Sequence, residues 1–130
     1  MKSEPDVYGW ADLLKEGEGT WDGVRNHRAR GNLAAMQMGD QAFFYHSNIG
    51  LEIVGIMEIT QADMADPSDP TGTWRAVKVK PVKPLPRPVT LKQVKADERL
   101  AEMELRRLSR LSVSKVTPEE WAIILELAGA

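Results

Sequence analysis

The chain has 130 residues, the size of one ordinary domain, so we expect a single domain over residues 1–130. Its composition, with 42% apolar and 28% charged residues and a net charge of -2, excludes a disordered chain, and no apolar run approaches the roughly 20 residues that span a bilayer. The absence of cysteine excludes disulfides, thiolate zinc sites and cysteine nucleophiles. Because no apolar leader follows Met1, we expect a cytoplasmic protein.

The first half of the chain has patterns typical of two helices and three strands. Apolar residues spaced by three and four positions indicate helices, and alternating segments rich in aromatic or β-branched residues indicate strands. The predicted elements are helices over 10–15 and 26–38 and strands over 41–47, 51–60 and 74–81. Turn residues between the first two strands favour a hairpin, and prolines and a glycine before the third favour a surface loop.

The second half begins with four prolines in eight residues, over 81–88, which predicts an extended connector or an edge strand. Two capping boxes, at Thr90 and Thr117, mark helix starts. The predicted elements are helices over 91–96 and 118–128, a helical turn over 99–104 and a strand over 111–116. The chain is therefore expected to be α+β, with short strands that close on themselves and helices at the ends and edges.

Basic residues are concentrated in one part of the chain. Residues 75–95 carry seven basic side chains and no acidic one, although the whole chain is slightly acidic. Lys78, Lys80 and Lys83 could therefore follow a nucleic-acid backbone, which a salt dependence of binding would reveal. The alternative is that this stretch is ordinary solvated surface.

Searches for catalytic and cofactor motifs find none. The chain has no glycine-rich phosphate loop, no dinucleotide fingerprint and no metalloprotease helix. His27 and His46 are its two histidines, and they lie far apart in the sequence. We therefore expect neither a metal site nor a bound cofactor.

Four short segments combine polar groups with aromatic residues or arginines, namely 2–4, 21–26, 45–48 and 109–112. Such groups suit a flat polar ring, because aromatic faces stack on bases, serine and asparagine read base edges, and arginine holds the adjacent phosphate. Trp21 is expected to lie in a polar turn, where an indole is hard to bury completely. The other three tryptophans are expected to be core anchors.

Two catalytic interpretations are alternatives to recognition of a base. A hydrolase would use Ser47 or Ser3 as nucleophile and His46 as base, but His46 and Ser47 are neighbours on a predicted strand and so point to opposite faces. A glycosidase-like pair, such as Glu4 with Asp22, is compatible with the spacing alone.

Several ordered blocks resemble those of the EVE domain family, and the match spans nearly the whole chain. The blocks are 2–5 (KSEP), 21–26 (WDGVRN), 44–47 (FYHS), 54–55 (VG) and 109–113 (SRLSV). The resemblance implies a PUA-like fold, which is a small bent β-barrel of about five or six strands with peripheral helices. It also implies a pocket for a modified nucleobase of DNA or RNA, such as a modified cytosine or a methylated adenine, in place of a catalytic centre.

The family motif carries over to ten positions in or around that pocket. In one expected cavity, aromatic rings would stack on the base, Ser and Asn side chains would read its edges, and Arg side chains would hold the phosphate. The stacking residues would be Trp21 and Tyr45, the edge-reading residues Ser3, Asn26 and Ser47, the phosphate contacts Arg25 and Arg110, with Lys2, His46 and Ser112 around them.

The family usually has a further strand before the KSEP block, so we expect the natural chain to begin a few residues before Met1. The nucleic-acid partner is expected to be bound by a monomer, without a membrane. Two other functions remain as alternatives: a small enzyme acting on a nucleotide or modified base through Glu4, His46 or Ser47, and a sensor of a small ligand or protein in the same groove.

Overall fold

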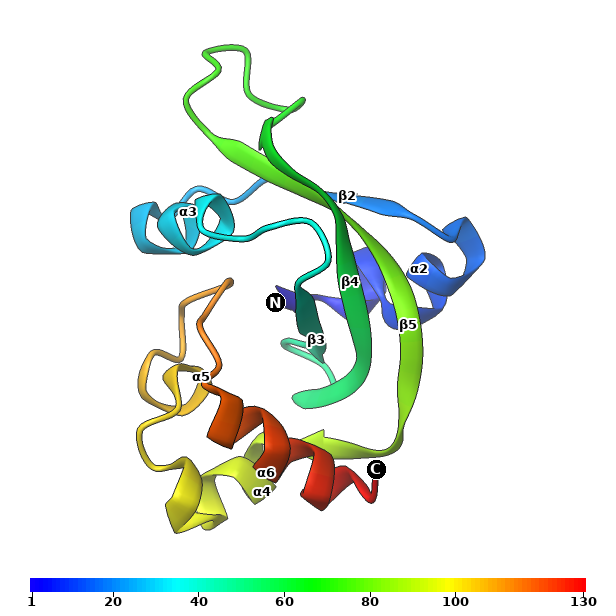
Figure 1. The fold of residues 1–130 in the computed structure, drawn as a ribbon, viewed down its shortest axis with the longest axis vertical. Coiled ribbons are helices and arrows are strands. Elements are labelled where there is room, and N and C mark those ends of the chain that lie inside the picture. Colours follow the sequence, from blue (N-terminus) through cyan, green and yellow to red (C-terminus); the bar gives the residue numbers. More distant parts are fainter.

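Five strands form one mixed sheet in the computed structural model, which describes residues 1–130 (Figure 1). The strands are β1 (Lys2–Ser3), β2 (Gly19–Trp21), β3 (Gln41–His46), β4 (Glu52–Ala65) and β5 (Arg75–Thr90). Their order across the sheet is β1-β3-β4-β5-β2. Only β1 and β3 pair in parallel, and the other neighbours are antiparallel.

The two longest strands, β4 and β5, determine the shape of the sheet. They form an antiparallel hairpin whose register shifts at several points between Ile53 and Met64. Each shift is a bulge or irregularity of the kind that increases twist and bends a strand. Figure 1 shows β4 and β5 curving together through the molecule, with β3 and β2 beside them. The expected bent sheet is thus present.

The proline-rich stretch forms the second half of β5 and is confirmed as an edge strand. β2 pairs with β5 only from Val77 to Val79, so beyond that point one side of β5 has no strand partner. Proline has no N–H to donate and is tolerated at such an edge.

The helices follow capping signals in the sequence. Asn26 caps α3, and Thr90 and Thr117 form capping boxes at the starts of α4 and α6. The helical elements are α1 (Pro5–Tyr8), α2 (Trp10–Glu16), α3 (His27–Ala34), α4 (Leu91–Ala96), the 3-10 turn η1 (Glu98–Leu100), α5 (Glu104–Arg107) and α6 (Pro118–Ala128). In Figure 1, α4, α5 and α6 lie toward the end of the molecule opposite the β4–β5 loop.

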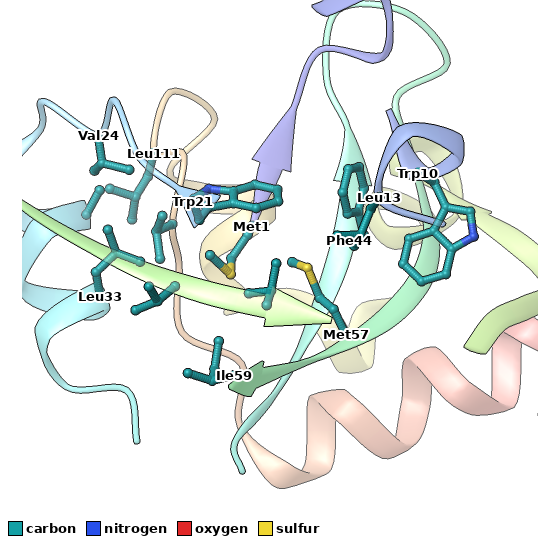
Figure 2. Close-up of a cluster of buried hydrophobic side chains, with 14 residues drawn as sticks. Met1, Trp10, Leu13, Trp21, Val24, Leu33, Phe44, Met57, Ile59 and Leu111 are labelled. Atoms are coloured by element: carbon teal, nitrogen blue, oxygen red, sulfur yellow. The ribbon is translucent and has the colours of Figure 1, made fainter. Parts of the chain in front are cut away.

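Two apolar clusters form the core, and β3 contributes to both. Phe44 belongs to the first cluster, whereas Phe43 and Tyr45 belong to the second. This division follows the alternation of side chains along a strand. Figure 2 shows the first cluster, where the Trp21 indole lies edge-on to the Phe44 ring with 5.4 Å between ring centroids. In the second cluster, Trp121 stacks on Phe43 with 3.8 Å between ring centroids.

The predicted strand over 111–116 is wrong. Leu111 and Val113 are buried as the alternation suggested, but their segment forms neither strand nor helix. Alternation reports which side chains are buried, and it does not guarantee a neighbouring strand. Two short strands, β1 and β2, were not predicted, and α3 ends at Ala34 instead of continuing to residue 38.

Candidate functional site

A cavity of about 510 Å³ opens where β1 meets the end of β3 and the irregular segment after α5. We call it the central groove. Eight of its twelve lining residues are polar or charged, and three leucines contribute apolar wall. Its lining residues are Lys2, Ser3, Glu4, Tyr45, Ser47, Asn48, Leu51, Leu91, Leu105, Ser109, Arg110 and Ser112.

The backbone of β1 brings three distant segments of the chain together at this groove. On one side Lys2 and Ser3 pair in parallel with the end of β3, and Ser47 N donates to Ser3 O at 2.9 Å. On the other side Lys2 N donates to Ser112 O at 2.8 Å. The structure therefore gathers six of the ten predicted site residues in one cavity: Lys2, Ser3, Tyr45, Ser47, Arg110 and Ser112.

The polar groups of the groove include both donors and acceptors. Lys2 Nζ donates to Ser109 O at 2.6 Å and lies 5.8 Å from the centroid of the Tyr45 ring. Burial lowers the pKa of the Lys2 ammonium and raises the pKa of the Tyr45 phenol. Glu4 Oε1 accepts a hydrogen bond from Asn48 Nδ2 at 2.7 Å.

Trp21 does not share a cavity with Tyr45, so the expected single cavity with two stacking walls is wrong. Trp21 lines a neighbouring cavity of about 370 Å³ that meets the central groove at Lys2 and Ser3. Trp21 is 8% exposed and belongs to the first core cluster, because β2 pairs it with Val77 of β5 and turns its indole inward. Little of the Trp21 surface is therefore available to a ligand in this conformation.

Arg25 lies in an ion pair instead of facing an open phosphate site. Its Nη1 donates to Asp66 Oδ2 at 2.8 Å, and its Nη2 donates to Ser68 Oγ at 3.2 Å. Asp66 also accepts from the N–H groups of Gly23 and Ser68. Burial opposes ionisation of Asp66, but the hydrogen bonds from Ser68, Arg25 and Gly23 outweigh it and hold its pKa well below the usual range.

Asn26 and His46 also form structural hydrogen bonds. Asn26 Oδ1 caps α3 by accepting from two backbone N–H groups, although Asn26 lines a third cavity of about 310 Å³ that shares Ser109 and Arg110 with the central groove. His46 Nε2 accepts from Trp10 N at 3.1 Å, and His46 is absent from the lining of the groove. Ser47, directly after β3, lines the groove and His46 does not, as the alternation along the predicted strand 41–47 indicated.

Lys78, Lys80 and Lys83 lie on β5 away from the lining of the central groove. Lys80 Nζ pairs with Glu58 on the adjacent strand at 3.2 Å, whereas Lys83 is exposed. Their expected contact with a nucleic-acid backbone stays a prediction.

Sequence reasoning did not assign six of the groove residues to the site. Asn48 and Ser109 fell inside the polar segments that were singled out, and Glu4 entered only as a catalytic alternative. Leu51, Leu91 and Leu105 carry no such signal, because an apolar residue at a strand or helix end predicts core. Their exposure to the groove depends on contacts between distant segments.

Searches for metal-binding clusters and membrane spans were negative. No three His, Asp or Glu side chains come close enough together to hold a metal ion. None of the helices has the length and apolar character needed to cross a bilayer. The carboxylates of the glycosidase-like interpretation are divided between two cavities, with Glu4 in the central groove and Asp22 in the neighbouring one.

Comparison with known sequences gives a family and several relatives. The EVE domain model matches residues 1–127. Thymocyte nuclear protein 1 of Mus musculus is 35% identical over 161 residues, which cover 98% of this chain and 71% of that protein. An uncharacterised protein of Schizosaccharomyces pombe is 39% identical over 127 residues, which cover 84% of this chain and 53% of that protein. This chain thus spans about half the length of the yeast relative.

Several solved structures share this fold. A Rhodopseudomonas palustris protein superposes with a TM-score of 0.94 at 49% identity, covering 99% of this chain and 90% of that one. Human THYN1 protein, in complex with DNA containing 5-methylcytosine, superposes with a TM-score of 0.89 at 32% identity, covering 100% of this chain and 96% of that one. The YTH domain of Zygosaccharomyces rouxii MRB1 shares the fold, with a TM-score of 0.58 at 16% identity.

These likenesses confirm the expected α+β, PUA-like architecture. The family model covers almost the whole chain, and the mouse relative is matched over more than two thirds of its length. The chain belongs to the EVE domain family.

Proposed function

We propose that this chain is a binding module that holds one modified nucleobase of DNA or RNA in the central groove. The observation that carries the proposal is its likeness to human THYN1 protein, which is 32% identical across the whole chain and forms a complex with DNA containing 5-methylcytosine. The groove of about 510 Å³ supports it, because that volume lies in the range of small-molecule pockets. The proposed module is a single cytoplasmic domain that acts as a monomer without metal or cofactor.

The hydrogen bonds around β1 favour a base that carries an amino group. Ser3 Oγ donates its proton to Tyr8 O at 2.6 Å, so only its lone pairs remain for a ligand. Lys2 Nζ uses one donor on Ser109 O and has further donors free. An acceptor next to a donor complements the amino group and ring nitrogen of cytosine or adenine. The proposed base is therefore a modified cytosine or a methylated adenine.

The apolar wall of the groove gives a way to sense a methyl group. One buried methyl contributes about 0.8 kcal/mol, which is roughly a fourfold preference over the plain base. Larger selectivity requires a polar contact that the modification strengthens. Removing the base from its stack costs a few kcal/mol, which contacts in the groove must offset.

Binding is favoured over catalysis by the positions of the candidate catalytic groups. Ser47 and Glu4 line the groove, but the one histidine near them accepts a hydrogen bond from Trp10 N and faces elsewhere. Neither hydroxyl nor carboxylate in the groove therefore has a histidine partner to activate it.

The test is a binding panel with a matched pair of serine variants. Probes are single-stranded DNA with cytosine or 5-methylcytosine and RNA with adenosine or N6-methyladenosine, and affinity is measured by fluorescence anisotropy. We expect at least fourfold tighter binding of one modified probe than of its plain partner. Ser112→Ala, in the groove, should weaken that binding severalfold, because it removes a hydroxyl from the lining.

Ser114→Ala is the matched control, since Ser114 lies in the same irregular segment but outside the lining of the groove. It should bind as the unmodified protein does. Equal affinity for every modified and plain pair would contradict the proposed function. An equal loss of affinity in both serine variants would show that the base does not bind in the central groove.

A further inference from the structure

A second depression, of about 430 Å³, continues the central groove on the side of α4. We call it the side groove. It shares Leu51 and Leu91 with the central groove, so the two are contiguous. Its other lining residues are Gly50, Thr90, Lys92 and Lys95.

The side groove carries two lysines, and the acidic side chain of Glu52 lies beside Gly50, one of its lining residues. Lys92 and Lys95 are three positions apart on α4 and therefore lie on one face of that helix. Neither forms a salt bridge, and no acidic residue lines the side groove. By contrast, Lys80 of the predicted backbone track pairs with Glu58.

Leu51, at the border between the two grooves, has an unusual conformation. Its φ is +48°, in the left-handed region that bulky side chains avoid, and the residue is 43% exposed. The conformation is held in place, because Leu91 N donates to Leu51 O at 2.8 Å. A strained backbone that presents an apolar side chain to solvent at the edge of a groove points to a ligand contact at that position.

We propose that the side groove holds the nucleotide next to the bound base. Leu51 packs against the base of that nucleotide and fills the space beside the base that has left the stack, as apolar wedges do in other nucleic-acid complexes. Lys92 and Lys95 contact the phosphates on either side of it. This inference rests on the proposed function, because the nucleotide in the side groove belongs to the same strand as the modified base in the central groove.

Leu51→Gly separates this role from a structural one. Glycine adopts a positive φ without strain, so the variant should unfold at an equal or higher Tm, measured by circular dichroism. Its affinity for the preferred oligonucleotide should fall at least fivefold, and clearly more than its affinity for the matching nucleoside monophosphate, titrated by nuclear magnetic resonance, because Leu51 also lines the central groove. Ile49→Ala is the control, because Ile49 is 57% exposed in the same turn and lines neither groove.

The lysines are tested by the dependence of binding on salt. Each phosphate contact to a single strand contributes about 0.7 to the slope of log K against log salt concentration. The double variant Lys92→Gln, Lys95→Gln should therefore reduce the slope by about 1.4. Lys15→Gln, on the exposed side of α2, should leave it unchanged.

The outcomes separate the two proposals. If the unmodified protein binds no probe of the panel, the proposed function fails and the side-groove nucleotide with it. If it binds a modified probe but Leu51→Gly and the lysine double variant bind that probe with unchanged affinity and salt slope, only the side-groove inference is overturned. An equal loss of affinity for the oligonucleotide and for the nucleoside monophosphate in Leu51→Gly would also overturn it, since Leu51 would then act only on the bound base itself.

Discussion

Gly55 lies where β4 passes beneath the indole of Trp10, and no other residue fits there without movement. A Cβ at this position would lie 2.5 Å from Trp10 Cη2, well inside van der Waals contact. Trp10 is 8% exposed and packs edge-on to Phe44, so the ring has little room to retreat. The glycine in the middle of a strand is thus explained by close packing.

We expect Gly55→Ala to lower the free energy of unfolding by about 1–3 kcal/mol, because overpacking forces rings or backbone out of place. Urea denaturation followed by tryptophan fluorescence measures the change. Gly31→Ala is the control, since a Cβ there meets nothing within 4 Å inside α3. That variant should gain about 0.5–1 kcal/mol from better helix propensity. Loss of stability in both variants would contradict the packing argument.

For Trp21, the sequence predicted the polar surroundings but not the burial of the ring. Its polar neighbours marked a segment whose cavity shares Lys2 and Ser3 with the central groove. Its burial was missed because it depends on pairing with Val77, which no local pattern reveals. Replacing Trp21 with alanine would therefore test the core as much as a ligand contact.

Among the secondary-structure elements, the β4–β5 hairpin is tied to the segment after β2 by the Asp66 cluster. Asp66 follows β4, its side chain is fully buried, and it accepts from Arg25 Nη1, Gly23 N and Ser68. Trp74 lies at the other end of the loop, and Arg25 Cζ stands 5.6 Å from the centroid of its ring. Arg25, which sequence analysis assigned to the phosphate, thus contacts both ends of the loop.

Asp66→Asn should destabilise the protein by about 3 kcal/mol. The partners of Asp66 are all hydrogen-bond donors, so the NH2 group of the asparagine would face another donor in a buried position. The free energy of unfolding in urea measures this loss. Asp63→Asn provides a contrast: Asp63 pairs with Arg75 but its side chain is 78% exposed, so the cost should stay below about 1 kcal/mol. Similar costs for the two variants would show that burial of Asp66 is not what gives the cluster its strength.

Elements with strong local signals were predictable from the sequence. The capping boxes at Thr90 and Thr117 gave the starts of α4 and α6, and the alternation of Phe43, Phe44 and Tyr45 gave the two faces of β3. β1 has only two residues, too few for any periodicity, and exists because its neighbours pair with it. The central groove was accordingly foreseen as a set of segments, whereas its apolar wall was not.

For the molecule as a whole, His46 links stability to pH. Its Nε2 accepts a hydrogen bond from Trp10 N, which requires a neutral ring nitrogen. Burial lowers the pKa of His46 below its ordinary 6.5, and the nearby Glu52 carboxylate offsets part of that change. Below pH 6.5 the unfolded chain therefore takes up a proton more readily than the folded one.

The contribution of His46 to stability is complete above pH 6.5 and is lost as the pH falls toward its folded pKa. The free energy of unfolding, measured in urea between pH 7 and pH 5, should decrease for the unmodified protein. His46→Gln, which does not titrate, should show a smaller decrease over the same range. An unchanged slope in that variant would assign the pH dependence to other groups.

The bond from Lys2 N to Ser112 O has a consequence for the order of events during synthesis. Lys2 on one wall of the groove is translated long before Ser112 on the opposite wall, so the groove is incomplete until both have been made. Contacts that join such distant positions also close late, because the entropy of the intervening loop opposes them. The complete groove can therefore form only once translation has passed Ser112.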